Sequence, residues 1–243
     1  MADYYLGTLT NTPVKFDSFS VTPNDPKDVF EFRLNGTRNI NIAITDISAG
    51  DDADLKLFRD SNFNGVFDSA DQQIASSSRF GDSDESINLA DQVTGLYFAQ
   101  VERYAPGSYG SVSYDIALST SDPSNILHTE HDFGNLSDND SRNGFVGNTD
   151  TIDTYKFSIG FYEGVNIKLE GLSSDADLRV IQDINNNGLV DSGEVIRTSN
   201  GFGIGSEEIL DINLSGDYFV QVYQFSGDTN YTLNLDYFTT PDL

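Results

Sequence analysis

Residues 175–194 read DADLRVIQDINNNGLVDSGE. In the first eight residues apolar and polar side chains alternate, as expected for a half-buried β-strand whose successive side chains point to opposite faces. The remaining twelve place side-chain oxygens at the first, third, fifth, ninth and twelfth positions and glycine at the sixth, which is the pattern of a calcium-binding loop. The stretch therefore predicts a strand that leads into an ion-binding turn.

The same pattern occurs a second time, nearer the N-terminus. Residues 52–71 read DADLKLFRDSNFNGVFDSAD and match residues 175–194 at a constant offset, with aspartate in place of glutamate at the last position. The match continues on both sides, where DVFEFRL corresponds to DTYKFSI and YFAQV corresponds to YFVQV. Self-similarity of this kind indicates two homologous units. We predict a first unit over residues 1–120, a linker over 121–130 and a second unit over 131–243.

Apolar residues recur at every second position in both units. Examples are the runs Phe30, Phe32 and Leu34, then Ile40, Ile42 and Ile44, then Tyr231, Leu233 and Leu235. A period of two is typical of strands with one buried face and one wet face, and no amphipathic helix longer than two turns is indicated. The sequence therefore predicts an all-β protein of two tandem antiparallel β-sandwiches, jelly-roll-like in type.

Each loop offers six candidate ligands for a divalent cation. They are Asp60, Asn62, Asn64, the Val66 carbonyl, Asp68 and Asp71 in the first loop, and Asp183, Asn185, Asn187, the Leu189 carbonyl, Asp191 and Glu194 in the second. Calcium accepts six to eight mixed oxygen ligands, whereas magnesium demands stricter geometry, so we predict two calcium sites, one in each repeat. The alternative is a polar hairpin turn, because Asn-Gly is also a common hairpin signal.

Strand-like residues enter and leave both loops. This pattern predicts a loop that closes a β-hairpin at the rim of a sandwich, and it argues against a helix–loop–helix sensor. Four more acids are candidates for additional metal ligands. Asp54 and Asp177 precede the two loops by six residues. Glu85 and Glu208 follow the loops and correspond to each other at the same offset as the two loops. Their alternative roles are strand caps and solvated strand starts.

The chain is strongly acidic. Its 243 residues include 39 Asp and Glu against 13 Lys and Arg, which gives a net charge of −26. No basic stripe is present to displace counterions, so neither nucleic acid nor an anionic membrane is expected as a partner. No apolar run reaches the roughly 18–20 residues of a membrane span, so membrane insertion is not expected either. Acids at ligand spacing favour the binding of hard cations over a purely solubilising role.

No catalytic arrangement is predicted. The two histidines, His128 and His131, lie at the predicted linker without the HExxH spacing, and the chain has no GxSxG motif and no cysteine. A binding surface is a separate possibility, because several aromatic residues lie in or beside predicted loops. These are Tyr104, Tyr109, Phe202, Tyr223 and Phe225. They either form a contact surface or cover sheet edges.

The order of these motifs resembles the bacterial pre-peptidase C-terminal (PPC) domain. Asp-Ala-Asp-Leu is followed by the Asp-x-Asn-x-Asn-Gly loop and then by Gly-x-Tyr-Phe-x-Gln-Val, and this order occurs twice, in tandem. The loop is similar to cyanobacterial forms of the family, and the family is related in fold to the collagen-binding modules of bacterial collagenases, which bind calcium. The resemblance implies an accessory β-sandwich of secreted peptidases and other extracellular proteins.

We therefore expect a non-catalytic calcium-binding accessory module in which the ion stabilises one hairpin loop in each sandwich. Its partners would be calcium and an extracellular protein, a polysaccharide or a neighbouring peptidase domain. One alternative is a calcium-dependent adhesion or matrix-binding module, and another is a cytoplasmic calcium buffer or sensor. The start, MADYYLGTLTNTP, lacks the regions of a classical signal peptide. An unconventional export route, a cytoplasmic location and an excised piece of a longer protein all stay open.

Overall fold

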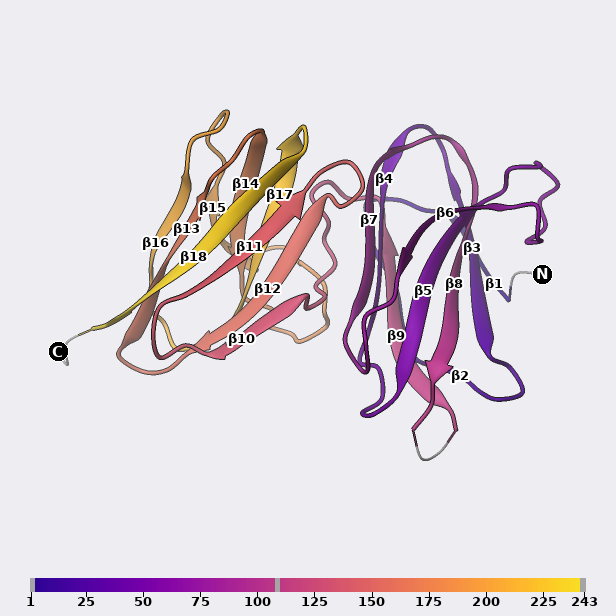
Figure 1. The fold of residues 1–243 in the computed structure, drawn as a ribbon, viewed down its shortest axis with the longest axis horizontal. Helices are drawn as coiled ribbons and strands as arrows, with labels where there is room; N and C mark the ends of the chain where they lie inside the picture. Colours follow the sequence, from indigo (N-terminus) through magenta and orange to yellow (C-terminus); the bar gives the residue numbers. More distant parts are fainter. Residues whose placement is uncertain (1–2, 108–109, 241–243) are drawn as a thin grey trace. The chain divides into compact units, whose positions relative to one another are not determined.

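The computed structural model describes residues 3–107 and 110–240 of the chain. The chain divides into two compact units, Met1–His128 and Thr129–Leu243. Each unit is built from β-strands arranged in two sheets (Figure 1), and the prediction of an all-β protein is confirmed. Among the described residues there is no helix of the length and apolar character that crossing a membrane requires.

The first unit is a sandwich of a five-stranded and a four-stranded sheet. Its strands are β1 (Tyr4–Thr8), β2 (Val14–Val21), β3 (Lys27–Leu34), β4 (Arg38–Thr45), β5 (Asp52–Arg59), β6 (Gln72–Ser77), β7 (Glu85–Gln92), β8 (Gly95–Ala105) and β9 (Val112–Ser119). The strand orders are β1-β3-β8-β5-β6 and β2-β9-β4-β7. Neighbouring strands are antiparallel except β1 and β3, which run parallel, a pairing that the sequence pattern did not predict.

The second unit repeats this topology strand for strand. Its strands are β10 (His131–Asn135), β11 (Asp140–Val146), β12 (Ile152–Ile159), β13 (Glu163–Glu170), β14 (Asp175–Ile181), β15 (Val195–Ser199), β16 (Glu207–Ile212), β17 (Gly216–Ser226) and β18 (Thr229–Thr239). The orders are β10-β12-β17-β14-β15 and β11-β18-β13-β16, again with the first strand parallel to the third. Each strand therefore has a counterpart in the other unit.

The alternating apolar residues form one core in each unit. In the first unit the inner faces of β3 and β4 contribute Phe30, Phe32, Ile42 and Ile44, all fully buried in one cluster that contains residues of both sheets. The equivalent cluster of the second unit includes Phe157 and other alternating residues of its strands. The period-two pattern therefore identified the face of each strand that is removed from water.

The predicted loops connect antiparallel neighbours in the five-stranded sheets. The first loop joins β5 to β6 and the second joins β14 to β15, so each closes a β-hairpin and neither is flanked by helices. Gly65 and Gly188, at the sixth loop position, have φ values of 72° and 73°. This left-handed conformation reverses the chain and favours glycine because a Cβ atom is strained there.

Candidate metal centres

The first loop is folded around its own polar side chains. Asp60 Oδ2 accepts the N–H of the loop glycine at 2.9 Å, and Asp71 Oδ2 accepts the N–H of Asp68 at 2.9 Å. The side-chain oxygens of Asn62 and Asn64 each accept the N–H two residues further along, at 3.1 and 2.7 Å. These bonds are the local Asx turns that short polar side chains form with the backbone. They bend the chain around an interior lined by the predicted ligand residues.

Two carboxylate oxygens of this loop have no partner. Asp60 Oδ1 and Asp71 Oδ1 are buried and make no hydrogen bond. The residue Asp60 as a whole is only 5 % exposed. A buried acceptor without a donor costs free energy, and a cation is the ligand that would satisfy it. The loop is held against the outer face of the sheet by Phe67, whose ring lies 5.0 Å from that of Phe58 and 5.2 Å from that of Phe98.

Two amide groups of the first loop contact one of its carboxylates. Asn64 Nδ2 donates to Asp68 Oδ2 at 2.7 Å, and Asn62 Nδ2 lies 3.4 Å from both oxygens of the same carboxylate. Hydrogen bonds from the Ala70 N–H and from these amides lower the pKa of Asp68, so this carboxylate is ionised near neutral pH. The two amides thus compensate a negative charge that a cation would otherwise neutralise.

The second loop has similar turns and a longer last side chain, but Asp183 Oδ1 accepts the N–H of Asn187 at 3.2 Å, whereas Asp60 Oδ1 has no partner. Asp183 Oδ2 accepts the N–H of the loop glycine at 2.9 Å, and Glu194 Oε2 accepts the N–H of Asp191 at 2.8 Å. The Nδ2 atoms of Asn185 and Asn187 both donate to Asp191 Oδ2 at 2.9 Å. Glu194 is buried, and its second oxygen accepts the N–H of residue 184 at 3.0 Å. Both loops therefore bring together the side chains that the sequence singled out.

The additional candidate ligands lie away from the loops. Asp54 and Asp177 stand near the start of β5 and β14, six extended residues before the loops, which corresponds to about 20 Å along a strand. They are therefore too far away to join the ion of the same loop. Glu85 is buried, but Glu208 is exposed, and the residue that occupies the place of Glu85 in the second unit is Glu207.

A shared set of contacts establishes this correspondence. Glu85 accepts hydrogen bonds from the Ser77 hydroxyl and from the backbone N–H of residue 79, and Glu207 accepts them from the Ser199 hydroxyl and from the backbone N–H of residue 201. The offset between the repeats changes by one because the strand that leaves the first loop has six residues and its counterpart has five. Glu207 is therefore the buried acid that sequence alignment missed.

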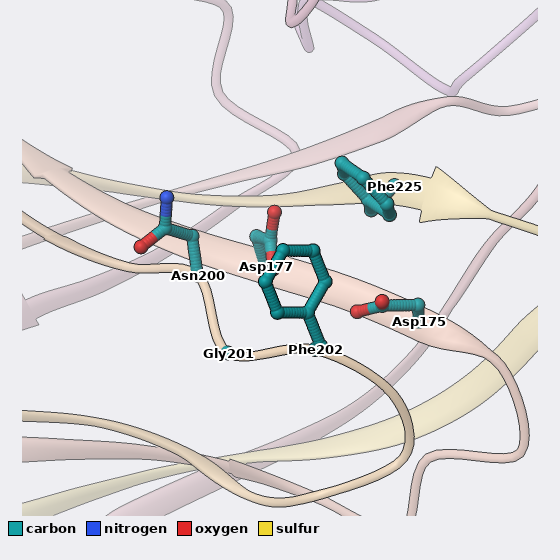
Figure 2. Close-up of a pocket in the computed structure, with 6 residues that line it drawn as sticks. All are labelled: Asp175, Asp177, Asn200, Gly201, Phe202 and Phe225. Carbon is teal, nitrogen blue, oxygen red and sulfur yellow. The ribbon is translucent and has the colours of Figure 1, made fainter.

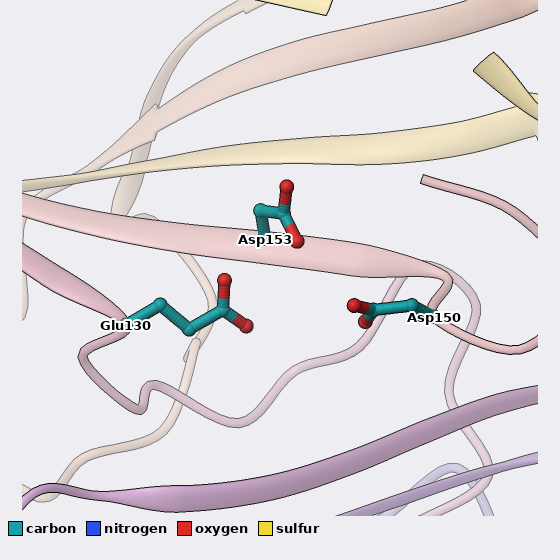
Figure 3. Close-up of side chains that lie close together, drawn as sticks. All are labelled: Glu130, Asp150 and Asp153. Carbon is teal, nitrogen blue, oxygen red and sulfur yellow. The ribbon is translucent and has the colours of Figure 1, made fainter. Parts of the chain in front are cut away.

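The second unit also contains a compact group of three acids. Glu130 before β10, Asp150 before β12 and Asp153 on β12 converge with their carboxylates facing one another (Figure 3), and one oxygen from each lies within 4.8 Å of the others. Burial, with Glu130 and Asp150 nearby, raises the pKa of Asp153 well above its usual range. This group could hold a cation, and no other group of three such residues is found in the described parts of the chain.

The first unit has a related arrangement around Asp28. The buried Tyr114 hydroxyl donates to Asp28, as the Tyr231 hydroxyl donates to Asp153 in the second unit. Burial, followed by the charges of Asp25 and Asp3, raises the pKa of Asp28. The repeated DVFEF and DTYKF segments aligned these two aspartates in the sequence, but alignment alone did not reveal that both are buried.

Comparison with protein families places one known domain in the first unit. Residues 26–103 match the family model of the bacterial pre-peptidase C-terminal domain. This span begins just before β3 and ends within β8, so it includes the first loop. The first unit therefore contains a pre-peptidase C-terminal domain, and the recognition made from the sequence is confirmed. No curated protein matches the chain.

Several solved structures are similar to the chain in part. The pre-peptidase C-terminal domain of a collagenase from Bacillus anthracis has 21 % identity, with a TM-score of 0.34 over 49 % of this chain and 95 % of that one. PliG, a periplasmic inhibitor of g-type lysozyme from Aeromonas hydrophila, has 19 % identity, with a TM-score of 0.30 over 44 % and 99 %. The CUB1–EGF–CUB2 fragment of human MASP-1/3 has 9 % identity, with a TM-score of 0.31 over 94 % and 100 %. At these values the likenesses carry no functional argument.

Proposed function

We propose that the chain is a non-catalytic accessory module of an extracellular bacterial protein, with two pre-peptidase C-terminal domains that each bind one calcium ion in a hairpin loop. The first-unit family match and the identical strand order of the second unit support the tandem assignment. The ions would be held by the loops Asp60–Asp71 and Asp183–Glu194. Each ion would stabilise its loop and reduce the repulsion within a chain of net charge −26.

The observation that carries this proposal is the pair of unpartnered oxygens in the first loop. Asp60 Oδ1 and Asp71 Oδ1 are contributed by the first and last ligand positions, and both are buried. A polar turn that served only to reverse the chain would leave such oxygens in water or bonded to the backbone. A cation bound between the two ends of the loop would satisfy both oxygens and would tie those ends together.

Ion binding would require the loop amides to turn over. The Nδ2 atoms of Asn185 and Asn187 now face Asp191, and a half-turn of each amide would exchange nitrogen for oxygen and direct two neutral ligands inward. The half-turn would give up the bonds that the two amide oxygens accept from the N–H groups of Asn187 and Leu189. Asp183, Glu194 and the Leu189 carbonyl would complete a set of at least six oxygens. A flexible set of that size favours calcium over magnesium, which prefers a near-octahedral shell that retains several waters.

The expected contribution of the ion to stability is large for a module of this size. A ligand that binds only the folded state at a concentration one hundred times its Kd stabilises that state by about 2.7 kcal/mol. Extracellular calcium in the millimolar range would provide this excess for a site with a Kd of about 10 μM. A cytoplasmic sensor would need micromolar or tighter affinity, so the measured Kd separates the two locations.

The test is a calorimetric calcium titration of the chelator-treated protein and of three variants. The wild type is expected to bind two ions, and Asp60→Ala and Asp183→Ala are each expected to bind one. Asp153→Asn, which replaces one carboxyl of the three-acid group without touching a loop, is expected to keep both. Loss of an ion in Asp153→Asn with no loss in the loop variants would overturn the assignment to the loops.

A further inference from the structure

A pocket opens on the second unit, remote from its calcium loop. It is lined by Asp175 and Asp177 of β14, Phe225 of β17, and residues 200–202 that follow β15 (Figure 2). Its volume of about 90 Å³ leaves room for several water molecules, or for the head group of one side chain. All of these residues belong to one sheet and its adjoining turn, so the pocket is a feature of the second unit by itself.

The base of the pocket carries negative charge that the protein leaves unpaired. Asp175 is 9 % exposed and Asp177 is 4 % exposed. Asp175 Oδ2 accepts the N–H of Gly203 at 2.8 Å, but its Oδ1 is buried without a partner, and no hydrogen bond to the Asp177 carboxylate is found in the described residues. Burial, with Asp175 and Glu207 nearby, raises the pKa of Asp177 to about 6, so it is still mostly ionised at neutral pH.

The basic residue of the same strand contacts groups of the neighbouring strand. Arg179, two residues beyond Asp177 on β14, donates Nε and Nη2 to Gln221 Oε1 at 2.9 and 2.6 Å, and its guanidinium lies 5.7 Å from the ring of Tyr223. A buried carboxylate without a counter-charge is costly. The pocket is therefore suited to receive a cation from outside the chain.

The wall of the pocket is aromatic and open to solvent. Phe202 is 93 % exposed and Phe225 is 60 % exposed, and their rings meet edge to face with centroids 6.3 Å apart. Such exposure yields no core stabilisation, so it does not explain why aromatic residues stand here. A flat cation can lie against an aromatic ring while its N–H groups reach a carboxylate, and guanidinium does both better than an ammonium group.

The first unit has related acidic and aromatic residues at the corresponding place, and Asp52 Oδ1 is again buried without a hydrogen bond. The counterparts of the acids and aromatic residues are Asp52, Asp54, Glu85, Phe80 and Tyr104, and both aromatic residues are again exposed. The counterpart of Gly201, however, is Arg79. Its Nη1 donates to the Asp84 carbonyl at 3.2 Å, and its charge partly offsets the burial that raises the pKa of Glu85. The residue next to the buried glutamate is thus an arginine in the first unit and a glycine in the second.

We propose that this pocket binds the guanidinium group of an arginine side chain presented by a partner protein. Asp175 and Asp177 accept its N–H donors, and Phe202 and Phe225 contact its flat faces and its aliphatic stem. The strongly acidic chain attracts such a basic partner at long range and speeds the encounter. This role is independent of calcium, because the pocket shares no residue with the loop.

The proposal is tested with three short capped peptides, Gly-Arg-Gly, Gly-Lys-Gly and Gly-citrulline-Gly, titrated into the labelled full chain and followed by NMR. The arginine peptide is expected to shift the backbone signals of residues 201–203 and 223–225. Citrulline, which has the same shape without the charge, is expected to bind at least tenfold more weakly, and lysine more weakly than arginine. Equal binding of the arginine and citrulline peptides, or shifts confined to other surfaces, would overturn the proposal.

Variants locate the contact. Asp177→Asn and Phe202→Ala are each expected to weaken binding of the arginine peptide at least tenfold, whereas Phe80→Ala, the matched change in the first unit, leaves it unchanged. The Asp177→Asn variant loses a poorly solvated charge, so it is expected to keep its fold. The NMR spectrum of the variant verifies this. If the site binds a cationic side chain, the arginine peptide has the same affinity when it is titrated in the presence of calcium and in the presence of chelator. Displacement of the peptide by calcium at these residues would instead make the pocket a metal site and refute the proposal.

Discussion

Glu85→Gln is expected to remove most of the pH dependence of stability of the first unit between about pH 4.5 and 7. Glu85 is fully buried at the start of β7, and its burial raises its pKa from 4.5 to about 7 despite hydrogen bonds from Ser77 and from the N–H of Arg79. The glutamine side chain would keep both contacts, because its amide can accept from the N–H and donate to the hydroxyl. The substitution therefore tests the charge alone.

The sign follows from the proton affinities of the two states. Below pH 4.5 the carboxyl is protonated in both the folded and the unfolded chain. Between pH 4.5 and 7 the unfolded chain loses the proton first, so stability falls as pH rises, and above pH 7 the loss is complete. A shift of two to three pH units, at about 1.4 kcal/mol each, corresponds to a loss of about 3 kcal/mol.

Thermal melts in chelator from pH 4.5 to 8 measure this effect. At pH 8 the variant is expected to melt higher than the wild type by roughly 10 °C, since 1 kcal/mol shifts the Tm of a domain by roughly 4 °C. The two curves should converge toward pH 4.5. Glu208→Gln, which neutralises an exposed glutamate, serves as the control and should track the wild type. Parallel curves for Glu85→Gln and the wild type would refute the reasoning about this buried charge.

Two further pairs of substitutions test other features by urea unfolding at pH 7. Phe63 is 80 % exposed with φ at 58°, and its counterpart Asn186 has φ at 55°. Asparagine tolerates this left-handed conformation better than phenylalanine does. Phe63→Asn should therefore stabilise the first unit by about 1 kcal/mol, and Asn186→Phe should destabilise the second by a similar amount. An unchanged midpoint in both would contradict the strain argument. Tyr231→Phe removes the donor to buried Asp153 and should cost about 1–3 kcal/mol, whereas the exposed Tyr162→Phe should cost nothing measurable. Equal stability of these two variants would show that the buried bond contributes little.

The strands were predictable because one physical signal is repeated in every strand. Phe30, Phe32 and Leu34 alternate with polar residues, and the same alternation recurs after the loops and in the second unit. The parallel partner of β3 was not predictable in the same way. β1 is short and has only partly buried or exposed side chains, so its composition does not indicate which strand it joins.

The candidate calcium loops were recognisable because their proposed ligands are close together in the sequence. Asp183 and Glu194 are eleven positions apart, and the turn residues between them fix how the loop folds. The pocket of the second unit joins Asp175 to Phe202 and Phe225 through strand pairing, and no spacing in the sequence reveals such a contact. The sequence pointed to both aromatic residues as a contact surface, but it gave them no acidic partner. Tyr109 of that same set lies outside the described residues.

The sequence pattern also does not show which of two neighbouring acids is buried. Glu207 and Glu208 have the same charge and adjacent positions, yet Glu207 is buried and Glu208 is exposed. Strand register decides between them, since a shift of one residue moves a side chain to the opposite face. The first exit strand is one residue longer than the second, and that difference is enough to misassign the pair.

The most direct test of the calcium assignment is a crystal structure of the calcium-loaded protein with the ions located by anomalous scattering. The account predicts one ion in the loop Asp60–Asp71 and one in the loop Asp183–Glu194, each within 2.3–2.6 Å of six or more oxygens. It also predicts that the amide oxygens of the loop asparagines face the ion. Empty loops, or ions found only between Glu130, Asp150 and Asp153, would contradict it.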